Sequence, residues 1–268
     1  SGNSVITTVT VTGDQSLDGV NDWALDGVDL TADEFYDRLI NGPEFPKTSQ
    51  PSMGDFAQVY ERLGQESDGI LSVHVSSKVS GTFNSAVQAK GAAQVACPIE
   101  VVDTQQATMA VGLVAIAAAK AVQQGAGLEE AAGATRAAAE RSRLFVLLDT
   151  LEYLEKGGRV GKAGALLGTL LRIRPMVTLR DGVVQELAKA RSRNGGIARL
   201  LQFTREAAPL DELSVLHTTT PEDAQALAQE VRDLMPGEQE PIIARAGPVI
   251  GTYAGPGALG IAVLRSET

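Results

Sequence analysis

The chain has 268 residues, of which 44% are hydrophobic, 21% charged and only 4% aromatic. This composition is typical of a soluble globular protein whose core is built from Ala, Val, Leu and Ile. A formal net charge of -10 argues against nucleic acid or an anionic membrane surface as the main partner.

Cysteine usage and the apolar runs indicate the cellular setting. The single cysteine, Cys97, excludes an internal disulfide and fits a reducing compartment. The opening residues lack the pattern of a signal peptide, and no apolar run approaches the roughly 18 residues that span a bilayer. We therefore expect a cytoplasmic protein without stable membrane insertion.

Strand and helix patterns alternate through the first half of the chain. The expected elements are a strand at 5–11, helices at 31–39 and 53–64, a strand at 70–76, a helix at 82–93, a strand at 99–103, helices at 107–124 and 128–142, and a strand at 143–149. Such alternation predicts a parallel sheet with crossover helices. Residues 40–52 are expected to form a loop.

The rhythm changes in the second half, where hairpin signals occur between helices. The expected elements are helices at 150–158 and 161–171, a hairpin at 173–192 with Asp181-Gly182 as its turn, a helix at 194–207, a strand at 213–218, a helix at 221–235 and paired strands near 241–253 and 258–265.

The fold class predicted from these patterns is α/β with two domains. Residues 1–149 would form an N-terminal parallel-sheet domain, and residues 150–268 an α+β C-terminal domain with a mixed or antiparallel sheet. Where two such layers meet, a ligand belongs in the crevice between them, at the carboxyl ends of the strands.

The usual catalytic and nucleotide-binding motifs are incomplete. "GPGALG" (255–260) contains a proline and has only eight residues after it, too few for the dinucleotide-binding helix. "GGRVGKAG" (157–164) lacks the first glycine and the hydroxyl residue of a P-loop. The two histidines, His74 and His217, have no nucleophile specified beside them, so both are interpreted as structural. No metal-ligand spacing is present.

Hydroxyl-rich loops and a few arginines remain as candidate functional features. "TSQPS" (48–52) and "SSKVSGT" (76–82) are typical of turns and helix caps when each is taken alone. Free N–H groups and hydroxyls at a strand-to-helix junction also form an anion site. Together with Arg159 and the arginines of "KARSR" (189–193), they favour a site for a small anionic head with an apolar remainder.

Five long motifs give the chain a resemblance to the DegV family, bacterial fatty-acid-binding proteins that serve a fatty acid kinase. The motifs are "TSQPSMGDFAQVYERL", "DGILSVHVSSKVSGTFNSA", "VVDTQQATMAVGL", "LDTLEYLEKGGRVGKAGALLGTLLRIRPM" and "GPGALGI". The resemblance runs from about Asp26 to Leu264. It implies two α/β domains with a fatty acid between them, its carboxylate at the domain junction and its acyl chain buried. The opening 23 residues do not match the family's first strand and helix closely.

The resemblance also implies residues that hold the carboxylate. Thr48 and Ser80 are the expected hydroxyl partners, and Gly81 would contribute a backbone N–H. Arg159 of "KGGR" matches the family arginine near the head group. Hydrogen bonds from such donors to a carboxylate are charge-assisted, and roughly twice as strong as neutral ones.

Two further positions are carried over with less support from the pattern. Tyr253 stands where many family members have a histidine beside the head group; tyrosine can donate a hydrogen bond but cannot become cationic near neutral pH. Ligand contact by Tyr253 is expected, whereas a part in phosphate transfer is in doubt. Arg191 is a weaker candidate for a surface that meets the kinase and phosphate.

The function implied is a carrier and not an enzyme. It would bury a long-chain fatty acid, with no cofactor, and present the carboxylate to a fatty acid kinase that makes acyl phosphate for phospholipid synthesis. An alternative is an enzyme acting on a small phosphorylated metabolite in the same crevice, with Arg159 and Lys162 binding the anion. A third possibility is a partner-binding protein whose crevice is vestigial.

Overall fold

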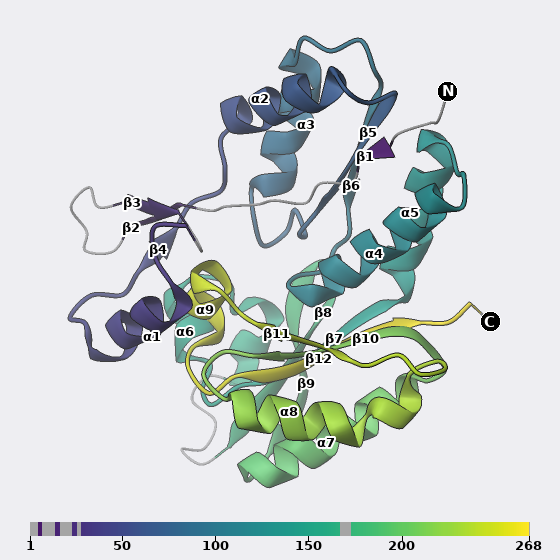
Figure 1. Cartoon of the computed structure of the whole chain (residues 1–268). Helices are drawn as coiled ribbons and strands as arrows, with labels where there is room; N and C mark the ends of the chain where they lie inside the picture. Colours follow the sequence, from purple (N-terminus) through teal and green to yellow (C-terminus); the bar gives the residue numbers. More distant parts are fainter. Residues whose placement is uncertain (1–4, 7–13, 17–22, 26–27, 167–172, 268) are drawn as a thin grey trace.

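The computed structural model describes residues 5–6, 14–16, 23–25, 28–166 and 173–267. These residues form a mixed α/β fold with a small parallel sheet and a larger mixed sheet, one above the other in the view of Figure 1. The predicted fold class is thereby confirmed.

The small parallel sheet has the strand order β1-β5-β6. Its strands are β1 (Val5–Ile6), β5 (Gly69–His74) and β6 (Ile99–Asp103). Every residue of β5 is buried, as expected of a parallel strand that helices cover on both faces. Helices α2 (Met53–Gly64) and α3 (Thr82–Ala92) lie on one side of this sheet, and α4 (Met109–Gln123) and α5 (Leu128–Arg141) on the other (Figure 1).

The larger sheet has six strands in the order β11-β10-β12-β7-β8-β9. They are β7 (Ser142–Leu147), β8 (Arg174–Arg180), β9 (Val183–Ala190), β10 (Leu210–His217), β11 (Ile242–Arg245) and β12 (Leu259–Arg265). Only the β10–β11 pair is parallel. Helices α7 (Arg193–Ala207) and α8 (Pro221–Glu230) pack on this sheet and lie below it in Figure 1, with the short η2 (Arg232–Leu234) after α8.

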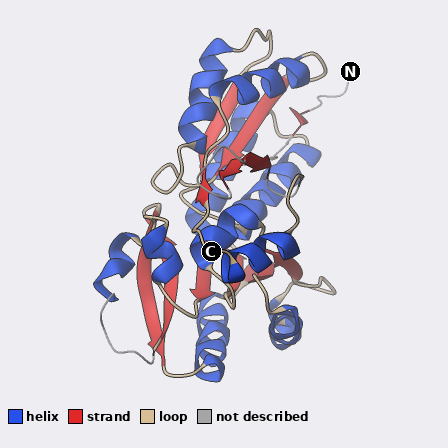
Figure 2. Ribbon diagram, turned by 90° about the vertical axis from the view of Figure 1, so that its left-hand side faces the viewer, coloured by secondary structure: helices blue, strands red, loops and turns tan. Residues whose placement is uncertain are grey.

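The α4–α5 helix pair joins the two sheets. Both helices contact strands of the small sheet and strands of the large sheet, and Figure 2 shows the same stacking after a quarter turn. One buried apolar cluster accordingly runs from Leu71 and Val102 through Leu113 to Leu144 and Leu264. In addition, Lys120 on α4 forms an ion pair with the buried Glu212 of β10. This cluster therefore extends from one sheet to the other, and further apolar clusters lie elsewhere among the described residues.

Several predicted elements are confirmed closely, because their signals are local. The hairpin at 173–192 is formed by β8 and β9, and both turn residues, Asp181 and Gly182, have positive φ angles of 52° and 76°. Such angles are those of the two-residue turn that Asp-Gly favours. The strand expected at 143–149 is β7, which pairs with β8 and β12, so sheet membership changes ahead of residue 149.

The prediction of paired strands at 241–253 and 258–265 is wrong in part. β12 occupies the second segment, but β11 ends at Arg245 and pairs with β10 instead of β12. Residues 248–254 form helix α9 (Pro248–Ala254). Pro248 at its first position and Gly255, with φ 70°, just past its end are the proline and glycine that start and stop helices.

The helix expected at 161–171 is a 3₁₀-helix, η1 (Gly161–Leu166), where the structure describes it, and the rest of that segment lies outside the described residues. The preceding helix is α6 (Glu152–Lys156), shorter than the predicted 150–158. The predicted strand at 5–11 begins as β1, and its continuation also lies outside the described residues.

A third, antiparallel sheet of short strands was not predicted. It contains β2 (Asp14–Ser16), β3 (Trp23–Leu25) and β4 (Lys47–Thr48), in the order β3-β2-β4. Helix α1 (Ala32–Asn41), which a Thr31–Glu34 capping box begins, precedes β4. β4 contacts α9. Among the described residues, no helix combines the length and the apolar character needed to cross a membrane.

Candidate functional site

The loop between β5 and α3 is held in place by hydrogen bonds from both halves of the chain. The N–H groups of Val79 and Ser80 both donate to the Ser76 carbonyl at 3.1 Å. The Ser76 hydroxyl in turn donates to the carbonyl of Gly182, in the β8–β9 turn, at 2.7 Å. These bonds fix the position of Ser80 before any ligand arrives.

Ser80 and Gly81 lie at the N-terminus of α3. The Ser80 hydroxyl accepts a hydrogen bond from the Thr82 N–H at 3.2 Å and shares a second with the Thr82 hydroxyl at 2.8 Å. The Gly81 N–H makes no hydrogen bond to any described residue. Unpaired N–H groups and the helix dipole at such an end favour an anion.

Thr48 on β4 and Tyr253 on α9 meet through their hydroxyl groups, which form a short hydrogen bond. They are 205 residues apart in the sequence, and the packing of β4 on α9 brings them together. Both side chains are half-buried. The position where the family often has histidine is therefore directly beside the threonine of "TSQP".

Arg159 connects this pair to the Ser80 loop. Its Nε donates to the carbonyl of Val79, the residue before Ser80, at 3.1 Å, and its Nη1 donates to the Gly157 carbonyl at 2.8 Å. The guanidinium also stacks over the Tyr253 ring, with 5.1 Å from Cζ to the ring centroid. Nη2 takes part in neither of these hydrogen bonds.

Thr48, Ser80, Gly81, Arg159 and Tyr253 are thus linked into one group, which we call the hydroxyl–arginine cluster. The first three come from one half of the sequence and the last two from the other. Gly81 also lies close to Gln50, two residues after Thr48. A Cβ added to Gly81 would lie only 3.0 Å from the Gln50 Cδ atom.

Gln50 and Gly157 are two contributors that sequence reasoning did not single out. Gly157 leaves room for Tyr253, because a Cβ there would lie 2.4 Å from the Cδ1 atom of that ring. The quoted motifs "TSQP" and "KGGR" contain both residues. The contact between Gly157 and Tyr253 nevertheless becomes visible only in the tertiary structure, because the two positions are far apart in the sequence.

Arg191 does not belong to the hydroxyl–arginine cluster. It is exposed in the bend between β9 and α7, and the described hydrogen bonds and ion pairs do not link it to the cluster. Its neighbour Arg193 pairs with Asp149 and with Asp223 and donates to the carbonyl of Gly257 at 2.8 Å. Arg193 therefore supports the "GPGALG" loop.

The hydroxyl–arginine cluster is rich in hydrogen-bond donors, the groups that an anion needs. Three hydroxyls, a helix N-terminus and one guanidinium supply donors, and Tyr253 and Val160 also pack against the buried apolar cluster that contains Leu154 and Ala163. Polar donors thus lie next to an apolar interior. Among the described residues, no three His, Cys, Asp or Glu side chains gather closely enough to hold a metal ion.

His74 lies in the core behind the Ser80 loop. Its Nε2 is 2.6 Å from the Ser72 hydroxyl, which accepts a hydrogen bond from the Tyr60 hydroxyl at 2.8 Å. Burial lowers the pKa of His74 from 6.5 to about 4, although the charge of Asp103 opposes the shift. The imidazole is therefore neutral at physiological pH, consistent with a structural histidine.

We expect His74 to make folding stability depend on pH between about 6.5 and about 4. The unfolded chain binds the proton near pH 6.5 and the folded chain only near pH 4, so stability is complete above 6.5 and falls as the pH drops to 4. At about 1.4 kcal/mol per pKa unit, the loss is on the order of 3 kcal/mol. Urea unfolding of the parent and of His74→Gln across this range measures it. Parallel pH profiles for the two proteins would contradict this role.

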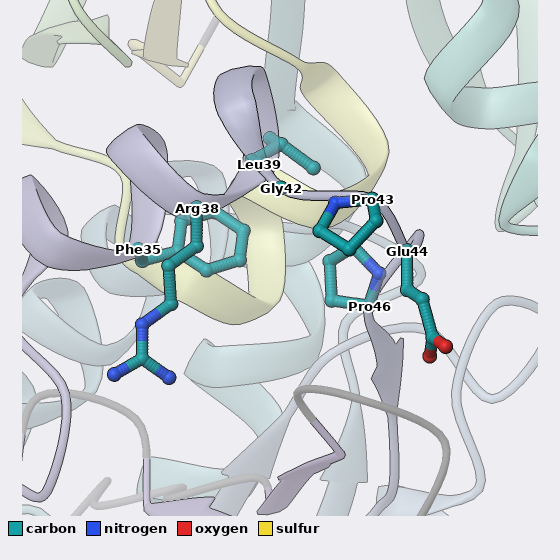
Figure 3. A pocket seen from close by; sticks show the side chains of 7 residues that line it. All are labelled: Phe35, Arg38, Leu39, Gly42, Pro43, Glu44 and Pro46. Atoms are coloured by element: carbon teal, nitrogen blue, oxygen red, sulfur yellow. The ribbon is translucent and has the colours of Figure 1, made fainter.

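One pocket of about 170 Å³ lies between α1 and the loop that leads to β4 (Figure 3). Its walls are Phe35, Leu39 and the rings of Pro43 and Pro46, while the charged ends of Arg38 and Glu44 point away from one another. Its volume is below the roughly 300–1,000 Å³ of small-molecule sites. We interpret it as a packing gap in the segment that positions Thr48.

Comparison with known proteins identifies the family to which the chain belongs. The family model described as "Uncharacterised protein, DegV family" matches residues 19–266. A DegV domain-containing protein of Streptomyces coelicolor is 39% identical over 220 residues, which cover 81% of this chain and 77% of the relative. The chain belongs to the DegV family.

Solved structures of the family extend this comparison. A DegV family protein from Thermus thermophilus, described by its fatty acid binding, has a TM-score of 0.86 at 32% identity and covers 95% of this chain and 90% of its own. DegV from Bacillus subtilis, a fatty acid binding protein, has a TM-score of 0.84 at 28% identity, with coverages of 94% and 90%. A stearic-acid-binding protein from Eubacterium ventriosum has a TM-score of 0.86 at 27% identity, with coverages of 95% and 90%.

Proposed function

We propose that this protein is a non-catalytic carrier of a long-chain fatty acid and that the hydroxyl–arginine cluster holds the carboxylate. The convergence of Thr48, Tyr253 and Arg159 on the N-terminus of α3 is the observation that carries the proposal. The fatty acids bound by the Thermus, Bacillus and Eubacterium relatives support it.

In the proposed complex, the Ser80 and Thr48 hydroxyls and the Gly81 N–H donate to the carboxylate. Tyr253 already shares a hydrogen bond with Thr48, so its hydroxyl orients the threonine toward the ligand. Arg159 supplies the positive charge, held in position by Val79 and Gly157. Such bonds are roughly twice as strong as those between neutral groups.

The acyl chain contributes the larger part of the affinity. Each buried CH₂ adds about 0.8 kcal/mol, so a chain of roughly sixteen carbons gives about 12 kcal/mol before the cost of association is subtracted. We infer that the tail enters the apolar interior beside Tyr253 and that the carboxylate, at the half-buried cluster, is presented to a fatty acid kinase in the cytoplasm. Exposed Arg191 is a proposed contact for that kinase.

Mass spectrometry of the purified protein, first native and then denatured, tests the proposal. We expect a stoichiometric long-chain fatty acid to accompany the folded chain and to be released on denaturation. An empty protein that takes up no added fatty acid would refute the carrier function and would favour an enzyme of phosphorylated metabolites. Such an enzyme has no reason to copurify with lipid.

A further inference from the structure

A second, larger pocket is lined by residues from the end of β6, from α5, from β7 and from the β8–β9 hairpin, so strands of both sheets contribute to it. Its volume is about 760 Å³, within the roughly 300–1,000 Å³ of small-molecule sites. We call it the junction pocket. Its charged side chains are three carboxylates and three arginines: Asp103, Glu140, Asp181, Arg136, Arg143 and Arg180.

The walls of the junction pocket are fixed by hydrogen bonds. Asp103 accepts from the N–H groups of Ser77, at 3.3 Å, and Gln105, at 2.9 Å. The β8–β9 turn, which forms the opposite wall, is tied to the same loop by the bond between Ser76 and Gly182. The pocket is therefore built before a ligand binds, which lowers the entropy cost of binding.

Two arginines in the junction pocket have no carboxylate partner among the described residues. Arg136 is paired with Glu100 at 2.9 Å. Arg143 donates only to the backbone carbonyls of Glu140 and Ser142, both at 2.7 Å, and Arg180 forms no ion pair in the described ranges. The carboxylate of Asp103 is already occupied by backbone N–H groups.

Arg143 and Arg180 lie close enough to repel one another, although the lining as a whole carries as many carboxylates as arginines. Burial, followed by the nearby charges of Arg265 and Arg180, lowers the pKa of Arg143. Two like charges of this kind are stabilised when a ligand supplies an opposite charge that both can hydrogen-bond.

We propose that the junction pocket binds a small polar molecule through an oxyanion, either a phosphate or a carboxylate, held between Arg143 and Arg180. Guanidinium groups form bidentate hydrogen bonds with both oxyanions. This site is separate from the hydroxyl–arginine cluster and does not rest on the function proposed for it.

Calorimetric titration with inorganic phosphate, and separately with malonate, tests the proposal at constant ionic strength. We expect saturable one-site binding of at least one probe, and the better probe identifies the oxyanion. Arg180→Gln changes an exposed side chain and should weaken binding about tenfold, the loss of one charge-assisted hydrogen bond. Arg143→Gln should do the same. Arg199→Gln, an exposed arginine of α7, is the matched control and should bind like the parent.

Two results would overturn the proposal. One is the absence of saturable binding for both probes, and the other is equal weakening by Arg180→Gln and Arg199→Gln, which would indicate a general charge effect. A Thr48→Val/Ser80→Ala variant separates the two sites, because it should lose fatty acid and keep the oxyanion. Loss of both ligands in that variant would show that the junction pocket is not a separate site.

Discussion

Replacing Thr48 by Val and Ser80 by Ala together is expected to weaken retention of a long-chain fatty acid by about a hundredfold or more. Each hydrogen bond to a charged group contributes about 1.5–3 kcal/mol, and 1.4 kcal/mol is a factor of ten in affinity. Valine keeps the shape of threonine, so the change removes the hydroxyl, together with its hydrogen bond to Tyr253, and leaves no cavity between β4 and α9. Equilibrium displacement of a fluorescent fatty acid measures the loss.

A matched control is available on the same helix. Ser85 lies on α3, and its hydroxyl makes no hydrogen bond among the described residues, so Ser85→Ala should retain fatty acid like the parent. The double variant should also keep the parent's dependence on chain length, about 0.8 kcal/mol per CH₂, because its apolar site is unchanged. Parent-like affinity in the double variant would remove Thr48 and Ser80 from the site.

Much of the fold could be predicted from local sequence signals. The elements that were predicted wrongly have local causes as well. Asp181-Gly182 specifies a hairpin because few other dipeptides accept two positive φ angles. The segment 248–254 was misread as a strand because Val249, Ile250 and Tyr253 are strand-forming residues. Its helix is set by the flanking Pro248 and Gly255 and by packing against α1 and α6.

The candidate site also has a part that the sequence reveals and a part that only the tertiary structure reveals. The hydroxyls of Thr48 and Ser80 stand in motifs that mark them from sequence alone. Their link through Tyr253 and Arg159 depends on β4 packing against α9, which no short-range pattern reports. Sheet membership of β7 was equally unpredictable, since a buried apolar run does not say which strands it will pair with.

Gly157→Ala is expected to weaken fatty acid binding about tenfold, although residue 157 supplies no donor of its own. The added Cβ would lie 2.4 Å from the Tyr253 Cδ1 atom and 2.6 Å from Cε1, so the ring must move. The Tyr253 hydroxyl then loses its hydrogen bond to Thr48, and the ring loses its contact with the Arg159 guanidinium. The expected loss of binding free energy is about that of one charge-assisted hydrogen bond. Overpacking of this kind also destabilises a fold by about 1–3 kcal/mol. The displacement titration and a urea unfolding curve measure the two effects.

Gly133→Ala is the control, because a Cβ at this position of α5 meets no atom within 4 Å. It should bind fatty acid like the parent and gain up to about 1 kcal/mol of stability from the higher helix propensity of alanine. Combining Gly157→Ala with Tyr253→Ala isolates the mechanism. If the ring carries the effect, Gly157→Ala costs little further affinity once the ring is absent. Additive losses would instead mean that Gly157 acts through the backbone of α6, because the new Cβ would also lie 3.1 Å from the Tyr153 carbonyl oxygen.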